Sequence, residues 1–130
     1  MPDVSLLYNI KRVEEKIIVT FIFSPRQKLE YNIELLKDRF DELKYVINNK
    51  DYSLFLSSSL RYSSSVGDIT NLVTAKNLVQ NKQTILQVLT QQKKEIDTLL
   101  KNDDGTNDWK FIQDDSNYIT IYSAKIKAMN

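Results

Sequence analysis

The sequence contains no cysteine and no histidine. Without cysteine, the chain can form no disulfide and offers no thiolate nucleophile, zinc ribbon or iron–sulfur ligand, so its redox compartment is undetermined. Without histidine, it lacks the commonest general base and the commonest transition-metal ligand. We therefore expect a protein that is not an enzyme and carries no cofactor. A carboxylate-based enzyme is the third-ranked alternative.

Glycine and proline are also scarce, with two of each in 130 residues. All-β folds need many tight turns, so this scarcity favours long helices joined by few connections. A hydrophobic fraction of 42% and a charged fraction of 27% are typical of a folded domain. We expect residues 1–130 to form a single all-α domain.

Neither sign of charge is in excess, because 18 basic residues nearly balance 17 acidic ones. A nucleic-acid-binding domain usually has a basic excess, so we expect no nucleic acid partner. No run approaches the roughly 18 apolar residues of a membrane-spanning helix, and the N-terminus does not read as a cleavable signal. We expect no transmembrane segment in this chain.

The stretch with the clearest helical pattern runs from Ser24 to Ile47. Its opening, Ser24-Pro25-Arg26-Gln27, has the serine, proline and glutamine of a capping box. Apolar residues then recur at alternating spacings of four and three, which indicates a helix with one buried face. They are Leu29, Ile33, Leu36, Phe40, Leu43 and Ile47. We predict a helix from Pro25 to about Asn48.

Two further segments share this periodicity. A helix is predicted from about Val4 to Phe21, antiparallel to the helix 25–48, although the β-branched end of this segment also suits a strand. Residues 51–80 are rich in serine and carry an apolar stripe across Gly67. We predict one long helix there, kinked or broken near Gly67, whose small serines let another helix approach closely.

The segment 81–102 is predicted to be a further amphipathic helix. Its predicted buried seam carries Leu86, Leu89, Ile96 and Leu100, and Lys82 and Lys93 occupy other positions of the same seam.

Residues 109–128 are ambiguous. Two β-prone runs around Asp114–Asn117 suggest a β-hairpin, whereas Trp109, Ile112, Ser116, Ile119, Ser123 and Ile126 fit a heptad. We favour the helix, since it can close a bundle. The predicted fold is an up-down bundle of four to five helices.

The clearest loop, residues 102–108, holds the sharpest metal hypothesis. Calcium takes oxygen ligands from Asp, Asn and backbone carbonyls. Asp103, Asp104, Asn107 and Asp108 lie close together around Gly105, but their spacing differs from that of an EF-hand. A calcium-binding domain using residues 103–108 is therefore the second-ranked function, and calcium is the one ligand ion we consider.

Residues 7–43 resemble an uncharacterised bacterial domain of unknown function, found in secreted, membrane-anchored and anti-sigma-associated proteins. The resemblance rests on the following residues, in order: Leu7-Tyr8, Lys11, Glu15, Phe23-Ser24-Pro25, Lys28, Leu36, Arg39 and Glu42-Leu43. The chain departs from the pattern at Asn9, where the family has proline, and in its serine-rich third section.

The resemblance implies a helical module placed just outside a membrane and carries over no catalytic or binding residue. It also suggests an ion pair between Glu15 and Arg39. We predict a non-enzymatic interaction or scaffold module of a membrane-associated or extracytoplasmic assembly, anchored through a segment absent here; a soluble cytoplasmic protein is the alternative. The expected partner is one or more proteins, contacted through apolar and aromatic side chains. The candidates are Ile18, Ile22, Phe23, Tyr31 and Trp109.

Overall fold

The computed structural model describes residues 24–129. Its α-helices are α2 (Pro25–Asn48), α3 (Phe55–Ala75), α4 (Lys82–Leu99) and α5 (Trp109–Lys127). Single 3₁₀ turns, η1 (Tyr52–Leu54), η2 (Val79–Asn81) and η3 (Leu100–Asn102), flank them. The predicted helix 4–21, its hairpin with α2 and its Glu15 ion pair lie outside the described residues.

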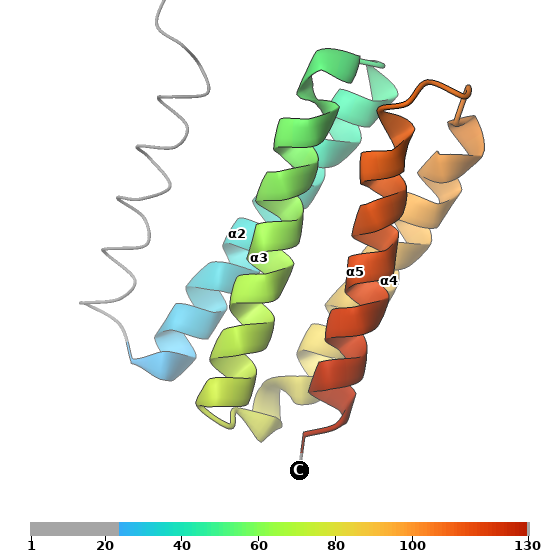
Figure 1. Cartoon of the computed structure of the whole chain (residues 1–130). Coiled ribbons are helices and arrows are strands. Elements are labelled where there is room, and N and C mark those ends of the chain that lie inside the picture. Colours follow the sequence, from blue (N-terminus) through green and yellow to red (C-terminus); the bar gives the residue numbers. More distant parts are fainter. Residues whose placement is uncertain (1–23, 130) are drawn as a thin grey trace, which may run out of the picture.

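The four helices form an elongated bundle in which consecutive helices run in opposite directions (Figure 1). Around the bundle the order is α2, α3, α5, α4, because α2 packs on α3, α3 on α5 and α5 on α4, while α2 and α4 touch much less. The link from α3 to α4 therefore crosses the bundle diagonally, and the neighbours α3 and α5 run parallel. The all-α bundle and the helical C-terminal segment are confirmed.

The start of α2 is the capping box that its sequence predicts. The Gln27 amide donates to Ser24 Oγ at 3.3 Å, and the Ser24 amide donates to Gln27 Oε1 at 3.0 Å. These two bonds satisfy donors that every helix N-terminus leaves unpaired. At the other end, Lys50 adopts the left-handed conformation, with φ of 52°.

Helix α3 passes through Gly67 without interruption, so the predicted break in the helix is wrong. The reason for a glycine there is proximity to α5: a Cβ built on Gly67 would lie 3.2 Å from the Tyr122 hydroxyl oxygen. About two turns earlier in α3, Ser59 Oγ donates to the Phe111 carbonyl oxygen at 3.0 Å. Small residues on α3 thus allow α5 to approach closely, as the serine content predicts.

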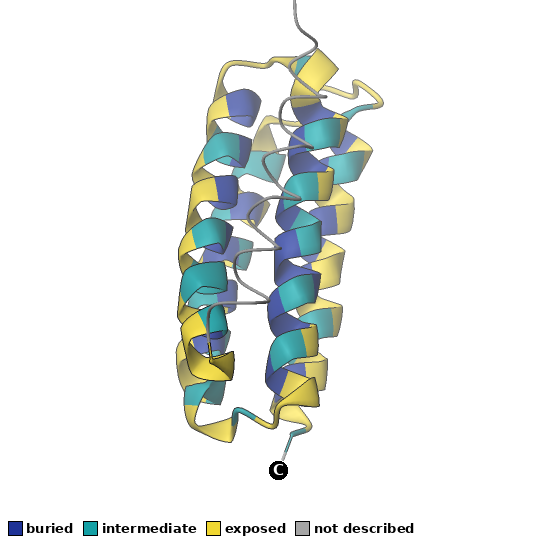
Figure 2. Ribbon diagram, turned by 90° about the vertical axis from the view of Figure 1, so that its left-hand side faces the viewer, coloured by how far each residue is buried: buried dark blue, intermediate teal, exposed yellow. Residues whose placement is uncertain are grey.

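The core runs along the bundle axis, with buried positions turned inward on every helix (Figure 2). The seam of α4 differs from the prediction: its buried residues are Ile85, Leu89, Gln92 and Ile96, whereas Leu86 and Leu100 are only half-buried. The seam is rotated relative to the prediction because a glutamine, Gln92, occupies a core position that an apolar pattern cannot reveal.

Lys82 belongs to the end of the bundle and not to its seam. Its ammonium group donates to the carbonyl oxygens of Lys127 at 2.8 Å and of Met129 at 2.9 Å. The first residue of α4 therefore caps the last turn of α5, where helix carbonyls have no intrahelical partner.

Candidate functional site

The family-like residues Arg39 and Glu42 form a charged cluster between α2 and α3. Arg39 Nη1 lies 3.7 Å from Glu42 Oε2, one turn along α2. Arg61 of α3 makes a close ion pair with Glu42 Oε1, to which Ser58 Oγ also donates at 3.4 Å. In the described residues, this part of the motif therefore fastens α3 to α2.

A second polar connection crosses the middle of the core. The Tyr62 hydroxyl of α3 donates to Gln92 Oε1 of α4 at 2.6 Å, and the two side chains are 0% and 4% exposed. Burial raises the pKa of Tyr62 well above its usual value, and the nearby Asp115 and Glu95 raise it further. Tyr62 is therefore a neutral donor that joins two diagonal helices.

Asp115 of α5 is the least expected residue in the core. It is 1% exposed, and neither of its carboxyl oxygens has a hydrogen-bond partner in the described part of the chain. Burial raises the pKa of Asp115 to about 8, an effect that the nearby Ser59 hydroxyl partly offsets and Asp114 strengthens. A raised carboxyl pKa is a feature of general acids. None of the clefts described below is lined by Asp115.

The acidic loop uses its carboxylates as hydrogen-bond acceptors. Asp104 accepts from the Thr106 amide at 3.0 Å, from Trp109 Nε1 at 3.1 Å and from the Tyr52 hydroxyl, while Asp103 accepts from the Gly105 amide at 2.8 Å. The hydrogen bonds from Thr106 and Tyr52 hold the pKa of Asp104 well below its usual range.

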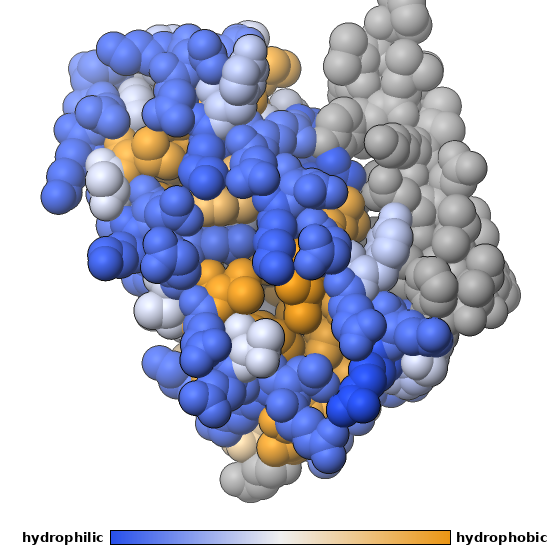
Figure 3. Space-filling view, turned by 180° about the vertical axis from the view of Figure 1, so that it is seen from behind, coloured by the Kyte–Doolittle hydropathy of each residue, from blue (hydrophilic) through white to orange (hydrophobic). Residues whose placement is uncertain are grey.

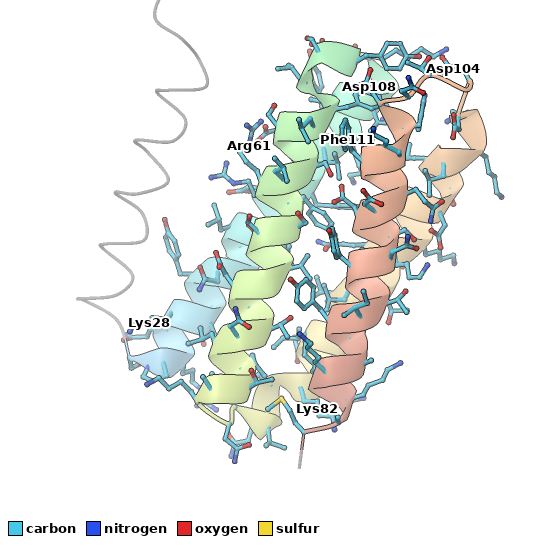
Figure 4. All side chains as sticks on the ribbon, in the orientation of Figure 1. Lys28, Arg61, Lys82, Asp104, Asp108 and Phe111 are labelled. Carbon is cyan, nitrogen blue, oxygen red and sulfur yellow. The ribbon has the colours of Figure 1, made fainter. Side chains whose placement is uncertain are left out.

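The other two predicted calcium ligands take no part in this network. Figure 4 shows Asp108 at the start of α5, near Asp104. The Asp108 side chain does not cap the helix, and Asn107 contributes its carbonyl oxygen to the Lys110 amide at 3.2 Å. Across residues 24–129, no three Asp, Glu, His or Cys side chains are grouped to hold a metal ion. The described geometry thus gives the calcium hypothesis no support.

A groove of about 370 Å³ separates α2 from α4. Phe40 and Val88 are its apolar lining residues. Seen from behind, the molecule has apolar surface between polar side chains (Figure 3). Lys44 lies across the groove, 3.5 Å from Glu95 Oε1 and 4.9 Å from the centre of the Phe40 ring. The groove continues past Lys44 toward Leu99.

Apolar side chains also flank the line along which α3 and α5 meet. Leu56 and Leu60 share the face of α3 that carries Ser59, because residues three and four apart lie on one side of a helix. They are 44% and 55% exposed. On α5, Tyr118 occupies the same side as Phe111 and Tyr122, and it is 44% exposed. We call Leu56, Leu60, Phe111, Tyr118 and Tyr122 the α3–α5 patch.

The structure places the predicted interaction residues in different environments. Trp109 is only 1% exposed and packs edge-on against Phe55, with 5.4 Å between ring centroids, so it is a core residue and a surface role for it is wrong. Tyr31 is half-buried on α2. Ile18, Ile22 and Phe23 lie outside the described residues. Leu60 and Tyr118, which are exposed, were not among the predicted interaction residues.

The profile of a family described as a domain of unknown function, DUF5667, matches residues 1–107. The chain belongs to this family. The DUF5667 match includes α2, α3 and α4 and ends just before α5, so three of the five residues of the α3–α5 patch and Asp115 lie beyond it. No curated protein and no solved structure is significantly similar to the chain. In the described residues, no helix is long and apolar enough to cross a bilayer.

Proposed function

We propose that this DUF5667 protein is a non-enzymatic interaction module that binds a protein partner through the α3–α5 patch. The observation that carries the proposal is the exposure of Leu56, Leu60 and Tyr118 beside a tightly packed helix pair. Large apolar side chains grouped on a rigid surface are typical of protein–protein interfaces. Tyrosine at such a position is favoured because it buries a large area and still offers a hydroxyl.

The placement of the polar side chains supports a scaffold in preference to an enzyme. The one carboxyl of strongly raised pKa among the described residues, Asp115, is enclosed in the core. The charged cluster around Glu42 and the carboxylate of Asp104 connect elements of the fold. These groups stabilise the bundle, whereas Leu56, Leu60 and Tyr118 expose large apolar side chains outside the core.

We also propose an extracytoplasmic or membrane-associated location for the assembly. The support is the similarity of residues 7–43 to domains of secreted and membrane-anchored proteins. Fractionating cells of the native source and following the protein with an antibody tests this location. Recovery wholly in the soluble cytoplasmic fraction would overturn it without affecting the proposed interaction.

Site-specific photo-crosslinking tests the interaction itself. A photoreactive amino acid is placed at Leu60 and, separately, at Tyr118, with Asn71 and Ala124 as exposed control positions on the same two helices. We expect one crosslinked protein species to appear from both patch positions and from neither control. Leu60→Glu should abolish it, whereas Asn71→Glu should not. The proposal fails if no discrete species forms, or if the controls give the same species.

A further inference from the structure

A groove of about 600 Å³ runs between α4 and α5 and concentrates positive charge. Of its ten lining residues, four are lysines and one is a carboxylate, whereas the whole chain has a net charge of only +1. The lysines are Lys93 and Lys94 on α4, Lys101 in η3 and Lys127 at the end of α5. Separate elements therefore direct the same charge into one cleft.

The single carboxylate in the groove, Asp97, already has two partners within the protein. Ser116 Oγ donates to Asp97 Oδ1 at 2.6 Å, and Lys93 Nζ lies 2.9 Å from Oδ2. Partial burial acts to raise the pKa of Asp97, but the hydrogen bonds of Ser116 and Lys93 outweigh it and lower the pKa. Lys93 also donates to Ser116 Oγ at 3.0 Å, which holds its ammonium group in a defined position.

The other three lysines of the groove form no such ion pair within the described residues. Among residues 24–129, neither Lys94 nor Lys101 nor Lys127 has a side-chain ion pair. The hydroxyl groups of Thr90 and Ser123 line the same groove and make no hydrogen bond within the described chain. Along its length, the groove thus offers cationic donors and hydroxyl donors without partners in the described part of the chain, and its one acidic group is already ion-paired.

We propose that the α4–α5 groove binds a ligand that carries two or more phosphate groups. Phosphate oxygens accept hydrogen bonds from ammonium and hydroxyl groups, and an elongated groove with lysines distributed along it matches several charges better than one. The ligand is either a soluble polyphosphorylated molecule or phosphate headgroups displayed on a membrane. The proposal goes beyond the protein-binding role, because it uses none of the side chains of the α3–α5 patch.

Binding is measured with two probes on the full chain at low salt, where screening is weak. Tripolyphosphate is titrated while backbone amide resonances are followed, and vesicles of phosphatidylglycerol are compared with vesicles of phosphatidylcholine by co-sedimentation. The test variant carries Lys94→Gln, Lys101→Gln and Lys127→Gln. The control carries Lys50→Gln, Lys76→Gln and Lys110→Gln, which removes the same charge from exposed positions that do not line the groove.

We expect saturable binding to at least one probe, resonance shifts confined to α4 and α5, and a loss of affinity of tenfold or more in the test variant alone. Binding to tripolyphosphate alone identifies a soluble ligand, and binding to anionic vesicles identifies headgroups. The proposal is overturned if neither probe binds, or if the control variant loses as much affinity as the test variant, which indicates a net-charge effect without a site. Matching circular dichroism spectra of both variants establish that folding is unchanged.

Discussion

The Tyr62 hydroxyl and the Gln92 side-chain carbonyl form a 2.6 Å hydrogen bond at the centre of the bundle. Their helices, α3 and α4, are diagonal and do not pack on each other. Both side chains are buried, so each satisfies a polar group that would otherwise be buried without a partner. The bond therefore fixes the relative rotation of two helices that apolar packing alone leaves less constrained.

Removing this hydroxyl should destabilise the protein more than an ordinary lost hydrogen bond. Tyr62→Phe leaves Gln92 Oε1 buried and unpaired, and we expect the free energy of unfolding to fall by about 1–3 kcal/mol. Gln92→Leu should cost a similar amount, because it leaves the hydroxyl unpaired. Urea denaturation followed by circular dichroism measures both.

The double variant provides the decisive comparison. If the two groups satisfy each other, replacing both by apolar groups should cost clearly less than the two single changes together. Strict additivity of the two single effects would contradict a direct interaction. Tyr45→Phe, at a tyrosine that is 71% exposed, is the matched control and should change stability by no more than about 0.5 kcal/mol.

Asp115 gives the protein a defined dependence on pH. Its folded-state pKa of about 8 lies above the ordinary value of 3.8, so the unfolded chain ionises first as pH rises. Between these two pH values the folded state holds a proton that the unfolded state has lost, and stability falls with rising pH. Above about pH 8 both states are ionised, and the loss levels off.

Asp115→Asn should abolish this slope. We expect the variant and the natural protein to have similar stability at pH 4, and the variant to be more stable at pH 8, by at most about 5 kcal/mol. Urea denaturation at several pH values measures the difference. Asp114→Asn, an exposed neighbour, should leave most of the slope in place. A pH-independent difference between Asp115→Asn and the natural protein would show that Asp115 is ionised in the folded state.

Gly67 lies at a position of α3 where the close approach of α5 leaves little room for a side chain. A Cβ there would already lie 3.2 Å from the Tyr122 hydroxyl oxygen, so a larger side chain must displace Tyr122 or separate the helices. We expect Gly67→Leu to lower the free energy of unfolding by about 1–3 kcal/mol. Gly67→Ala should cost less, because alanine favours the helix by up to about 1 kcal/mol over glycine.

Asn71→Leu is the matched control for this change, since Asn71 is exposed on the same helix. Thermal unfolding of the three variants gives the ranking. Equal stability of Gly67→Leu and Asn71→Leu would contradict a close approach of α3 and α5 at this point.

Local signals explain which parts of the fold were predictable. The start of α2 could be predicted to the residue because Ser24, Pro25 and Gln27 mark it within four positions. The heptad from Trp109 to Ile126 indicated α5 in the same way, and its inward positions are buried except for the half-buried Ser123. The rotation of α4 could not be predicted, because the hydrogen-bond partner of the buried Gln92 is Tyr62, thirty residues away.

The candidate sites were less predictable for a related reason. Periodicity shows which face of a helix is apolar, but it does not show where a bundle leaves that face uncovered. Trp109 was therefore named as an interaction residue although it is buried, and the exposed Leu60 and Tyr118 were not named. Asp115 falls in the stretch Asp114–Asn117, which has the composition of a turn. No sequence pattern marks a carboxyl group that is buried without a hydrogen-bond partner.

The last prediction concerns Asp104, which joins η1, the loop and α5 through Tyr52, Thr106 and Trp109. Because its pKa is held below the ordinary value, its contribution is fully present above about pH 4 and is lost as pH falls further. Asp104→Ala should lower the melting temperature at pH 7 and expose Trp109 to solvent, seen as a red shift in its fluorescence. Asp108→Ala, which removes a loop carboxylate that does not cap α5, should do neither. Millimolar calcium should leave the melting temperature of both variants and of the natural protein unchanged; a calcium-dependent rise lost only in Asp104→Ala would instead assign the loop to calcium.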